Sequence, residues 1–226
     1  MIRRLARGLR RRALRLVRGE PPVPLMHITQ ANTLESYETL YGSEDLVGQY
    51  LEPSRLAFYE EVAEVCALLA PGSAIDVGCG TGHLLLALTR RLAQPCAVTG
   101  VDYSPQAIRR AEASIPGGRW IVSDIDHLRL EERFDLVLCT EVLEHLEDPV
   151  RAVEVLESLQ APGGSIVVTV PDGALDRFEG HVQFWTEDEF AAFLRPHGLV
   201  ELRRLSDVTL LAVLRSPARG PAASTG

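Results

Sequence analysis

The sequence predicts an α/β fold: a doubly wound, mostly parallel seven-stranded sheet with helices on both faces and an antiparallel last strand. Short apolar runs alternate with amphipathic segments of helical spacing, which is the pattern of a parallel sheet covered on both faces. A glycine-rich loop joins the first strand to the helix that follows it. Only Ser206 and Asp207 separate the last two apolar runs. That connection is too short for a crossover, so we expect these two strands to pair antiparallel.

Each strand and helix is assigned from the local spacing of apolar residues. Seven short apolar runs are expected as strands: 74–78, 97–102, 120–124, 134–140, 165–170, 199–205 and 208–214. Five segments with apolar residues at every third or fourth position are expected as helices: 56–69, 84–92, 105–115, 149–159 and 187–195. Pro71 and Gly72 end the first helix, and Ser104 with Pro105 supplies the N-cap and the first helical residue of the third.

The composition is that of an ordinary globular protein. Of the 226 residues, 46% are hydrophobic and 24% are charged, which suits one domain with its own core. The longest apolar runs have about six residues, and a transmembrane helix needs about 20. The four cysteines form no CxxC pair, which argues against a zinc knuckle and against a disulfide framework. We therefore expect a cytoplasmic location.

Charge is distributed unevenly along the chain. Residues 1–18 contain eight arginines and no acid, and because the net charge is −8, the rest of the chain carries −16. This basic arm and a proline-rich linker occupy residues 1–24, a single domain is expected at 25–215, and the tail at 216–226 is expected to be disordered. The acidic domain disfavours a nucleic-acid partner, because phosphate contacts supply most of the affinity for DNA or RNA.

Three interpretations of the basic arm stay open. Its apolar residues recur at helical spacing between arginines, which is typical of an amphipathic helix in weak contact with an anionic membrane surface. Blocks of like charge are also typical of solvated tails. In the third interpretation, Met26 is the true start of the protein.

The segment Ile75–Gly82 reads IDVGCGTG and lies between the first strand and its helix. Glycines there let the backbone approach a ligand closely, and the helix N-terminus offers free N–H groups. Two phosphate-binding motifs do not fit, because the dinucleotide fingerprint needs glycine where His83 stands and the P-loop needs a lysine, which the chain lacks. Asp76 would repel a pyrophosphate and attract a cation. The expected ligand therefore carries positive charge and no phosphate.

The loop DVGCGTG resembles motif I of the class I S-adenosylmethionine-dependent methyltransferases, and the resemblance covers most of residues 50–215. It implies the Rossmann-like fold of that family, S-adenosylmethionine as cofactor, and a cap over it formed by helices in residues 25–55. Asp102 matches the acid that the family places on the ribose hydroxyls, Asp124 and Ile125 match the adenine contacts, and Asp76 would face the methionine ammonium. The cofactor residues that the resemblance implies are Asp76, Gly78, Cys79, Gly80, Gly82, Asp102, Tyr103, Asp124, Ile125 and Thr140.

Residues 140–149, TEVLEHLEDP, follow the fourth strand, over the carboxyl edge where ligands of open α/β sheets bind. The segment resembles the corresponding stretch of quinone-biosynthesis O-methyltransferases. Together with the later GHVQFWT at 180–186, it also resembles the metal-dependent 2′-O-methyltransferases of small RNAs, in which two glutamates and two histidines hold magnesium. If the first segment is helical, Glu141, Glu144 and His145 share one face.

Two interpretations of this acceptor region stay open. In one, Mg²⁺ or another divalent cation binds to Glu141, Glu144, His145 and His181 and lowers the pKa of an acceptor hydroxyl. In the other, His145 is a general base or a structural residue. His145 and His181 are the expected catalytic residues, and Tyr50 and Trp185 are the aromatics expected beside the acceptor.

The resemblance predicts transfer of a methyl group from S-adenosylmethionine to a hydroxyl of a small-molecule acceptor, which is a sugar, phenol or quinol precursor. Alternatives on the same scaffold are N- or C-methylation and non-catalytic binding of the cofactor. A nicotinamide oxidoreductase is disfavoured by His83 in the place of the third glycine.

Overall fold

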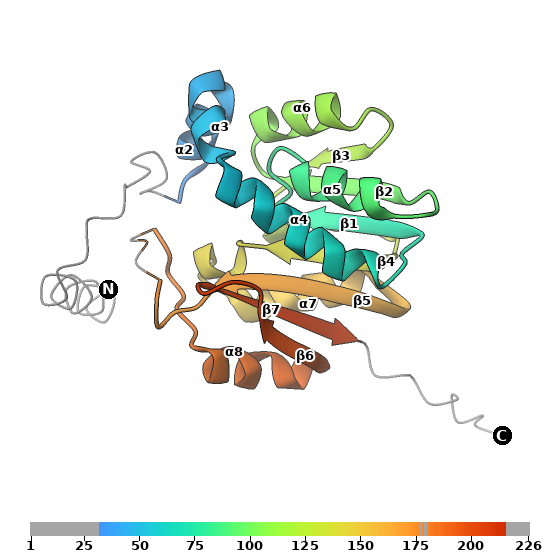
Figure 1. Cartoon of the computed structure of the whole chain (residues 1–226), viewed down its shortest axis with the longest axis vertical. Coiled ribbons are helices and arrows are strands. Elements are labelled where there is room, and N and C mark those ends of the chain that lie inside the picture. Colours follow the sequence, from blue (N-terminus) through green and yellow to red (C-terminus); the bar gives the residue numbers. More distant parts are fainter. Residues whose placement is uncertain (1–31, 177, 179, 216–226) are drawn as a thin grey trace, which may run out of the picture.

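The computed structural model of the chain describes residues 32–176, 178 and 180–215. The basic arm, the linker and the tail at 216–226 lie outside the described residues, so the expectations for them stay predictions. Seven strands are present: β1 (Ser73–Val77), β2 (Ala97–Asp102), β3 (Arg119–Val122), β4 (Phe134–Thr140), β5 (Gln160–Pro171), β6 (Leu199–Arg204) and β7 (Thr209–Arg215). They form one sheet in the order β3-β2-β1-β4-β5-β7-β6 (Figure 1).

The predicted strand directions are confirmed. Neighbours from β3 through β5 pair parallel. The last strand, β7, runs antiparallel to both β5 and β6, because the tight turn at Ser206 and Asp207 returns the chain directly alongside β6. Only β5 differs clearly from expectation. It begins at Gln160, immediately after the preceding helix, instead of at residue 165.

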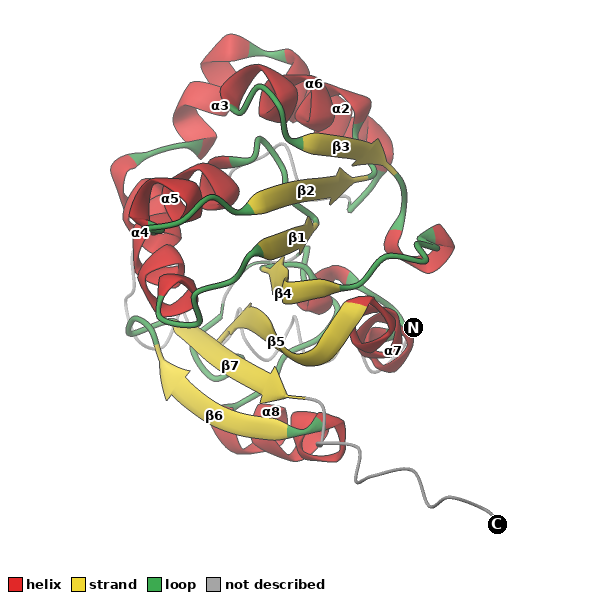
Figure 2. Cartoon of the chain, turned by 90° about the vertical axis from the view of Figure 1, so that its right-hand side faces the viewer, coloured by secondary structure: helices red, strands yellow, loops and turns green. Residues whose placement is uncertain are grey.

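Helices cover both faces of the sheet. They are α2 (Leu34–Gly42), α3 (Glu44–Tyr50), α4 (Pro53–Ala67), α5 (His83–Arg91), α6 (Pro105–Ser114), α7 (Pro149–Leu159) and α8 (Glu187–Leu194). Figure 2 shows α4 and α5 on one side of the sheet and α7 and α8 on the other, and each pair closes its own buried apolar cluster. Between β3 and β4 the described chain forms only a single 3₁₀ turn, Ile125–His127.

Capping residues define most of the helix starts. The side chains of Ser104, Asp148 and Thr186 accept hydrogen bonds from backbone N–H groups in the first turns of α6, α7 and α8, as the sequence predicts for Ser104. Proline occupies the first helical position of α4, α6 and α7. For α4 this places the start at Pro53, three residues before the predicted start.

The helices expected to cap the cavity are α2 and α3, and we call residues 32–52 the cap. Their apolar residues form a small cluster of their own with α6. Polar contacts fix the cap to the domain: the Glu38 carboxylate accepts hydrogen bonds from the Ser104 hydroxyl and the Gln106 backbone N–H, and the Arg110 guanidinium donates to the Tyr41 carbonyl. The cap is therefore anchored to the beginning of α6.

The indole of Trp120, on the edge strand β3, occupies a slot left by glycines. A Cβ atom at Gly100 would overlap the Trp120 ring and come within 2.9 Å of the Cys79 sulfur. Gly82 faces the same ring, at 3.1 Å from the position of its Cβ. The Trp120 ring therefore packs against the glycine loop, and the missing side chain of Gly100 leaves the space for the ring.

We expect Gly100→Ala to lower the free energy of unfolding by about 1–3 kcal/mol, because the added methyl overpacks the Trp120 slot. Gly48→Ala in α3 is the matched control, since no atom lies within 4 Å of its Cβ position. Alanine there should raise stability by about 0.4–1 kcal/mol. Urea unfolding of the two variants measures both changes, and equal effects would contradict the assignment.

Candidate functional site

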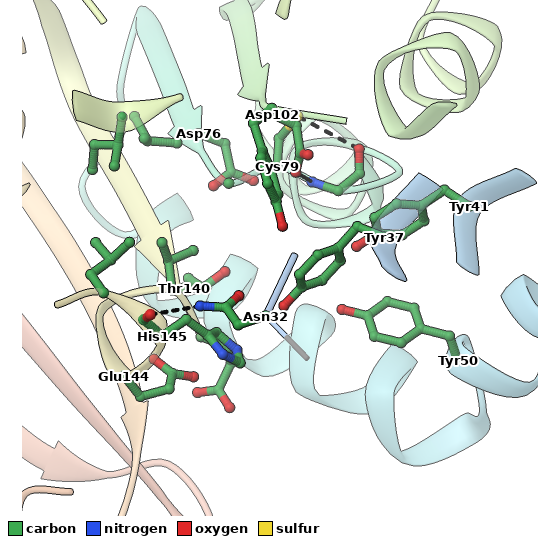
Figure 3. Close-up of a pocket in the computed structure, with 18 of the residues that line it drawn as sticks. Asn32, Tyr37, Tyr41, Tyr50, Asp76, Cys79, Asp102, Thr140, Glu144 and His145 are labelled. Atoms are coloured by element: carbon green, nitrogen blue, oxygen red, sulfur yellow. Dashed lines mark hydrogen bonds between the residues drawn. The ribbon is translucent and has the colours of Figure 1, made fainter. Parts of the chain in front are cut away.

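A cavity of about 510 Å³ lies at the carboxyl ends of β1, β2 and β4, where the strand order reverses and open α/β sheets bind ligands. The cap and the first turn of α4 close its side. All five tyrosines of the chain line it, which are Tyr37, Tyr41, Tyr50, Tyr59 and Tyr103. Figure 3 shows Asp102 and Glu144 in different parts of the cavity, with Tyr37, Tyr41 and Tyr50 along a third side.

Nine of the ten predicted cofactor residues line this cavity: Asp76, Gly78, Cys79, Gly80, Asp102, Tyr103, Asp124, Ile125 and Thr140. The tenth, Gly82, does not. It is the N-cap of α5 with a left-handed φ of 77°, and it packs against Ala111 and Trp120. In this structure it lets the helix begin close to its neighbours, and a ligand contact at Gly82 stays a prediction.

The glycine loop and the end of β2 are held together by one carboxylate. The backbone N–H of Gly80 donates to one oxygen of Asp102 at 2.9 Å, and that of Ser104 donates to the other oxygen at 2.9 Å. Gly78 has φ 84°, and a side chain there would overlap Val142. The loop therefore keeps its backbone open to the cavity, with the Asp102 carboxylate at a fixed position beside it.

Asp76 lies at the floor of the same region. It is 1% exposed, and its Oδ1 atom has no hydrogen-bond partner among the described residues. Burial, reinforced by the nearby Asp102, raises the pKa of Asp76 to about 7, and burial raises the pKa of Asp102 to about 6. Two neighbouring buried carboxyls with raised pKa values favour a positively charged ligand.

Asp124 lies two residues past β3 instead of at its end. Its Oδ1 atom accepts from the Asp126 backbone N–H at 3.0 Å and caps the 3₁₀ turn. The turn buries Ile125 against the domain, and both residues line the cavity. The structure therefore brings the loops after β1, β2 and β3 to one cavity, as the sequence predicts.

A second polar cluster lies in the loops after β4 and β5. Glu144, His145 and His181 each place one possible ligand atom within 4.8 Å of the others. Glu144 is 1% exposed, and neither of its oxygens has a hydrogen-bond partner among the described residues. Burial, with the charge of Glu141 next, raises the pKa of Glu144. We call these three residues the acceptor cluster.

His145 is held at its backbone and at one ring nitrogen. Its carbonyl accepts from the Asn32 side chain at 2.7 Å (Figure 3), which ties the cap to the acceptor cluster. The ring forms a hydrogen bond with the backbone of Gly180, whereas its Nδ1 atom is buried without a partner in the described chain. Burial and the neighbouring His181 lower the pKa of His145 to about 3, so the ring is neutral.

Glu141 does not join the acceptor cluster, which corrects the predicted set of four ligands. Its backbone has a left-handed φ of 55°, and only Leu143–His145 are helical, as a 3₁₀ turn. The expected shared helical face therefore does not exist. The Glu141 carboxylate lines the cavity and accepts from the Thr169 hydroxyl at 3.0 Å.

Asn32 and Arg55 line the cavity although the sequence did not predict them, and Asp176 was not expected beside His181. Arg55 lies 5.0 Å from the Tyr50 ring centre and 5.8 Å from that of Phe58. In the part of the chain that the structure describes, its guanidinium makes no hydrogen bond or ion pair. Tyr50 lines the cavity as predicted. Trp185 packs instead against Phe190 and Phe193 in the core, so its expected place beside the acceptor is wrong.

No helix in the described residues is long and apolar enough to cross a membrane.

Known proteins resemble this chain in sequence and in fold. It is 33% identical over 132 residues to a ubiquinone biosynthesis O-methyltransferase of Albidiferax ferrireducens, covering 53% of this chain and 50% of that protein. It is 34% identical over 102 residues to a trans-aconitate 2-methyltransferase of Escherichia coli, covering 45% and 40%. The chain thus spans about half or less of the length of these relatives.

Solved structures agree on the fold. The N-methyltransferase NodS of Bradyrhizobium japonicum, in complex with S-adenosylhomocysteine, superposes with a TM-score of 0.64 and 25% identity, covering 83% of this chain and 100% of that one. A DhpI complex with S-adenosylhomocysteine has a TM-score of 0.70 at 18% identity, covering 85% and 99%, and shares the fold. The family described as methyltransferase domain matches residues 50–207. The chain therefore belongs to this methyltransferase family, and its resemblance to the class I S-adenosylmethionine-dependent enzymes is confirmed.

Proposed function

We propose that this chain transfers the methyl group of S-adenosylmethionine to a hydroxyl of a small-molecule acceptor, a sugar, phenol or quinol precursor. The observation that carries the proposal is the acceptor cluster. Buried hydrogen-bond acceptors converge there, on Glu144, His145 and His181, and the described chain supplies no donor to the Glu144 oxygens or to His145 Nδ1. Such a set favours an electrophile or the proton of an acceptor hydroxyl.

The other end of the cavity fits S-adenosylmethionine, which supplies a methyl group activated on a sulfonium. Asp102 would accept hydrogen bonds from both ribose hydroxyls, and Asp76 would face the methionine ammonium. The loop after β3, with Asp124 and Ile125, would contact the adenine. The raised pKa values of Asp76 and Asp102 support this placement, because a cationic ligand stabilises both carboxylates. The S-adenosylhomocysteine complex of NodS supports the same cofactor.

Arg55 would bind the carboxylate of the cofactor's methionine part. It is the one arginine among the described residues that line the cavity, and two aromatic rings hold its guanidinium. A planar guanidinium with free N–H groups matches a carboxylate in geometry and charge. The residue thus gains in the complex the partner that it lacks in the described chain.

Glu144, His145 and His181 would hold Mg²⁺ or another divalent cation. When bound, the cation would lower the pKa of the acceptor hydroxyl. A mixed carboxylate and imidazole set suits Mg²⁺, Mn²⁺ or Zn²⁺. The unpartnered oxygens of Glu144 and the neutral ring of His145 fit a cation. The rival interpretation makes His145 a general base, but a group with a pKa of about 3 is poorly matched to a hydroxyl at neutral pH.

Methylation of an amine is the second candidate function. The tyrosine-lined cavity and the buried Glu144 would attract an ammonium group, and NodS is named an N-methyltransferase. Turnover of amines, with no turnover of hydroxyl compounds, would favour this candidate.

We expect excess EDTA to abolish methyl transfer, because it removes the cation that activates the hydroxyl, and Mg²⁺ or Mn²⁺ to restore it. The assay follows S-adenosylhomocysteine formation with a panel of sugars, phenols and catechols. Calorimetry in EDTA should show unchanged binding of S-adenosylhomocysteine, because Asp76 and Asp102 lie outside the acceptor cluster. His145→Ala and His181→Ala should lose turnover, and His197→Ala, which removes the ring paired with Glu157 of α7, should not. Full activity in EDTA would eliminate the cation and leave methyl transfer standing.

Arg55→Gln should weaken binding of S-adenosylhomocysteine by about 1.5–3 kcal/mol, because a hydrogen-bonded ion pair is lost. Methylthioadenosine has no carboxylate, so its affinity should be the same for the variant and the original chain. Arg151→Gln, at an exposed pair with Glu154, is the control and should change neither affinity. Calorimetry measures all three, and equal weakening of both ligands by Arg55→Gln would refute the carboxylate contact.

Binding of S-adenosylhomocysteine should tighten as pH rises from 5 to 7.5. The ligand ammonium favours ionised Asp76 and Asp102, which in the free protein keep their protons up to about pH 7 and 6. The Asp76→Asn variant should bind S-adenosylhomocysteine more weakly. Its affinity should also lack the increase centred near pH 7 that the ionisation of Asp76 produces. The same raised pKa values mean that the ligand-free protein loses stability as pH rises from about 4 to 7, because the folded state binds more protons than the unfolded state. A pH-independent affinity would contradict the ammonium contact.

A further inference from the structure

We propose that Asp176 is the positioning residue of the acceptor cluster. It holds His181 as the tautomer with hydrogen on Nδ1, and so turns the Nε2 lone pair toward Glu144. Nothing in the family match or in the named relatives assigns a role to Asp176. The consequence for turnover rests on the proposed function, whereas the tautomer itself does not.

The geometry fixes which ring nitrogen carries the hydrogen. The Nδ1 atom of His181 lies 2.7 Å from Oδ2 of Asp176, and the two side chains are 9% and 7% exposed. A carboxylate accepts hydrogen bonds and does not donate them, so Nδ1 must be the donor. In the neutral imidazole Nε2 then carries a lone pair, and it lies 3.9 Å from Oε1 of Glu144, which is too far for a hydrogen bond.

Asp176 is itself held by its surroundings. Its Oδ1 atom accepts from the Phe178 backbone N–H at 2.9 Å, and its own N–H donates to the Asp172 carbonyl at 2.7 Å. Asp172 is buried, and its carboxylate accepts from the Arg204 guanidinium of β6 at 2.6 Å. The position of the Asp176 carboxylate is therefore fixed through a chain of contacts that reaches the edge of the sheet.

The tautomer decides what the acceptor cluster can bind. With hydrogen on Nε2, His181 would turn a donor, not a lone pair, toward Glu144. With hydrogen on Nδ1, His181 adds a third acceptor to those of Glu144 and His145. Carboxylates behind metal-binding histidines act in this way, and their loss typically costs 10–100-fold in metal affinity. Asp176 therefore keeps the cluster selective for a cation or for an acceptor's own proton.

The experiment uses the full chain with ¹⁵N-labelled histidine, free of metal. In the original chain we expect the ring spectrum of His181 to show hydrogen on Nδ1. In Asp176→Asn the amide can donate to Nδ1, so the hydrogen should move to Nε2. Asp176→Glu keeps a carboxylate and should retain hydrogen on Nδ1. The matched control is Glu157→Gln, because the Glu157 carboxylate lies 3.0 Å from His197 Nδ1 in a second histidine–carboxylate pair of the described residues and should change His197 alone.

Binding measurements complete the test. We expect Asp176→Asn to weaken Mn²⁺ binding by about 10–100-fold, and Asp176→Glu and Glu157→Gln to change it far less. Unchanged binding of S-adenosylhomocysteine shows that each variant is folded. Hydrogen on Nε2 of His181 in the original chain, or on Nδ1 in Asp176→Asn, would overturn the proposal. If the original chain binds no Mn²⁺ but shows the expected tautomers, the cation in the proposed function fails and the role of Asp176 stands.

Discussion

The hydrogen bonds of Asp102 hold together the part of the molecule on which the cavity depends. Its two oxygens accept from the backbone of Gly80, in the loop after β1, and of Ser104, before α6. Glu38 of the cap accepts from the same serine's hydroxyl, so the cap, the glycine loop and the sheet meet at one point. An acid that organises backbone in this way cannot be exchanged for an apolar residue, because two buried N–H groups would lose their partners.

Buried acids are the common feature of both ends of the cavity. Asp76 at one end and Glu144 at the other each have an oxygen without a partner in the described chain, and burial raises both pKa values. Isolated buried charges are costly in a folded protein. The arrangement is understandable if ligands complete it, with a cationic cofactor beside Asp76 and an electrophile beside Glu144. On this view the protein is less stable without its ligands than with them.

Most of the fold could be predicted from the sequence because it depends on local signals. Apolar spacing, caps and prolines determine each strand and helix, and the short turn after β6 determines the direction of β7. The cofactor residues were assigned from the resemblance of the glycine loop and of the acids at the strand ends to the family's motifs. The exclusion of Glu141 from the acceptor cluster and the packing of Gly82 could not be predicted, since a left-handed backbone and a packing contact are tertiary features. Arg55 and Asp176 carried no signal in the sequence, because only the folded chain brings them to the cavity and to His181.

The two ends of the cavity are held by separate contacts, with consequences for how such proteins diverge. The cofactor end depends on the first three strands and Asp102. The acceptor end depends on the loop after β5, which Asp172 and Arg204 fasten to the edge strand β6. Substitutions in residues 172–186 can therefore reshape the space for the acceptor while the cofactor contacts persist. Acceptor specificity can therefore change during evolution through substitutions in this loop, while binding of the methyl donor is retained.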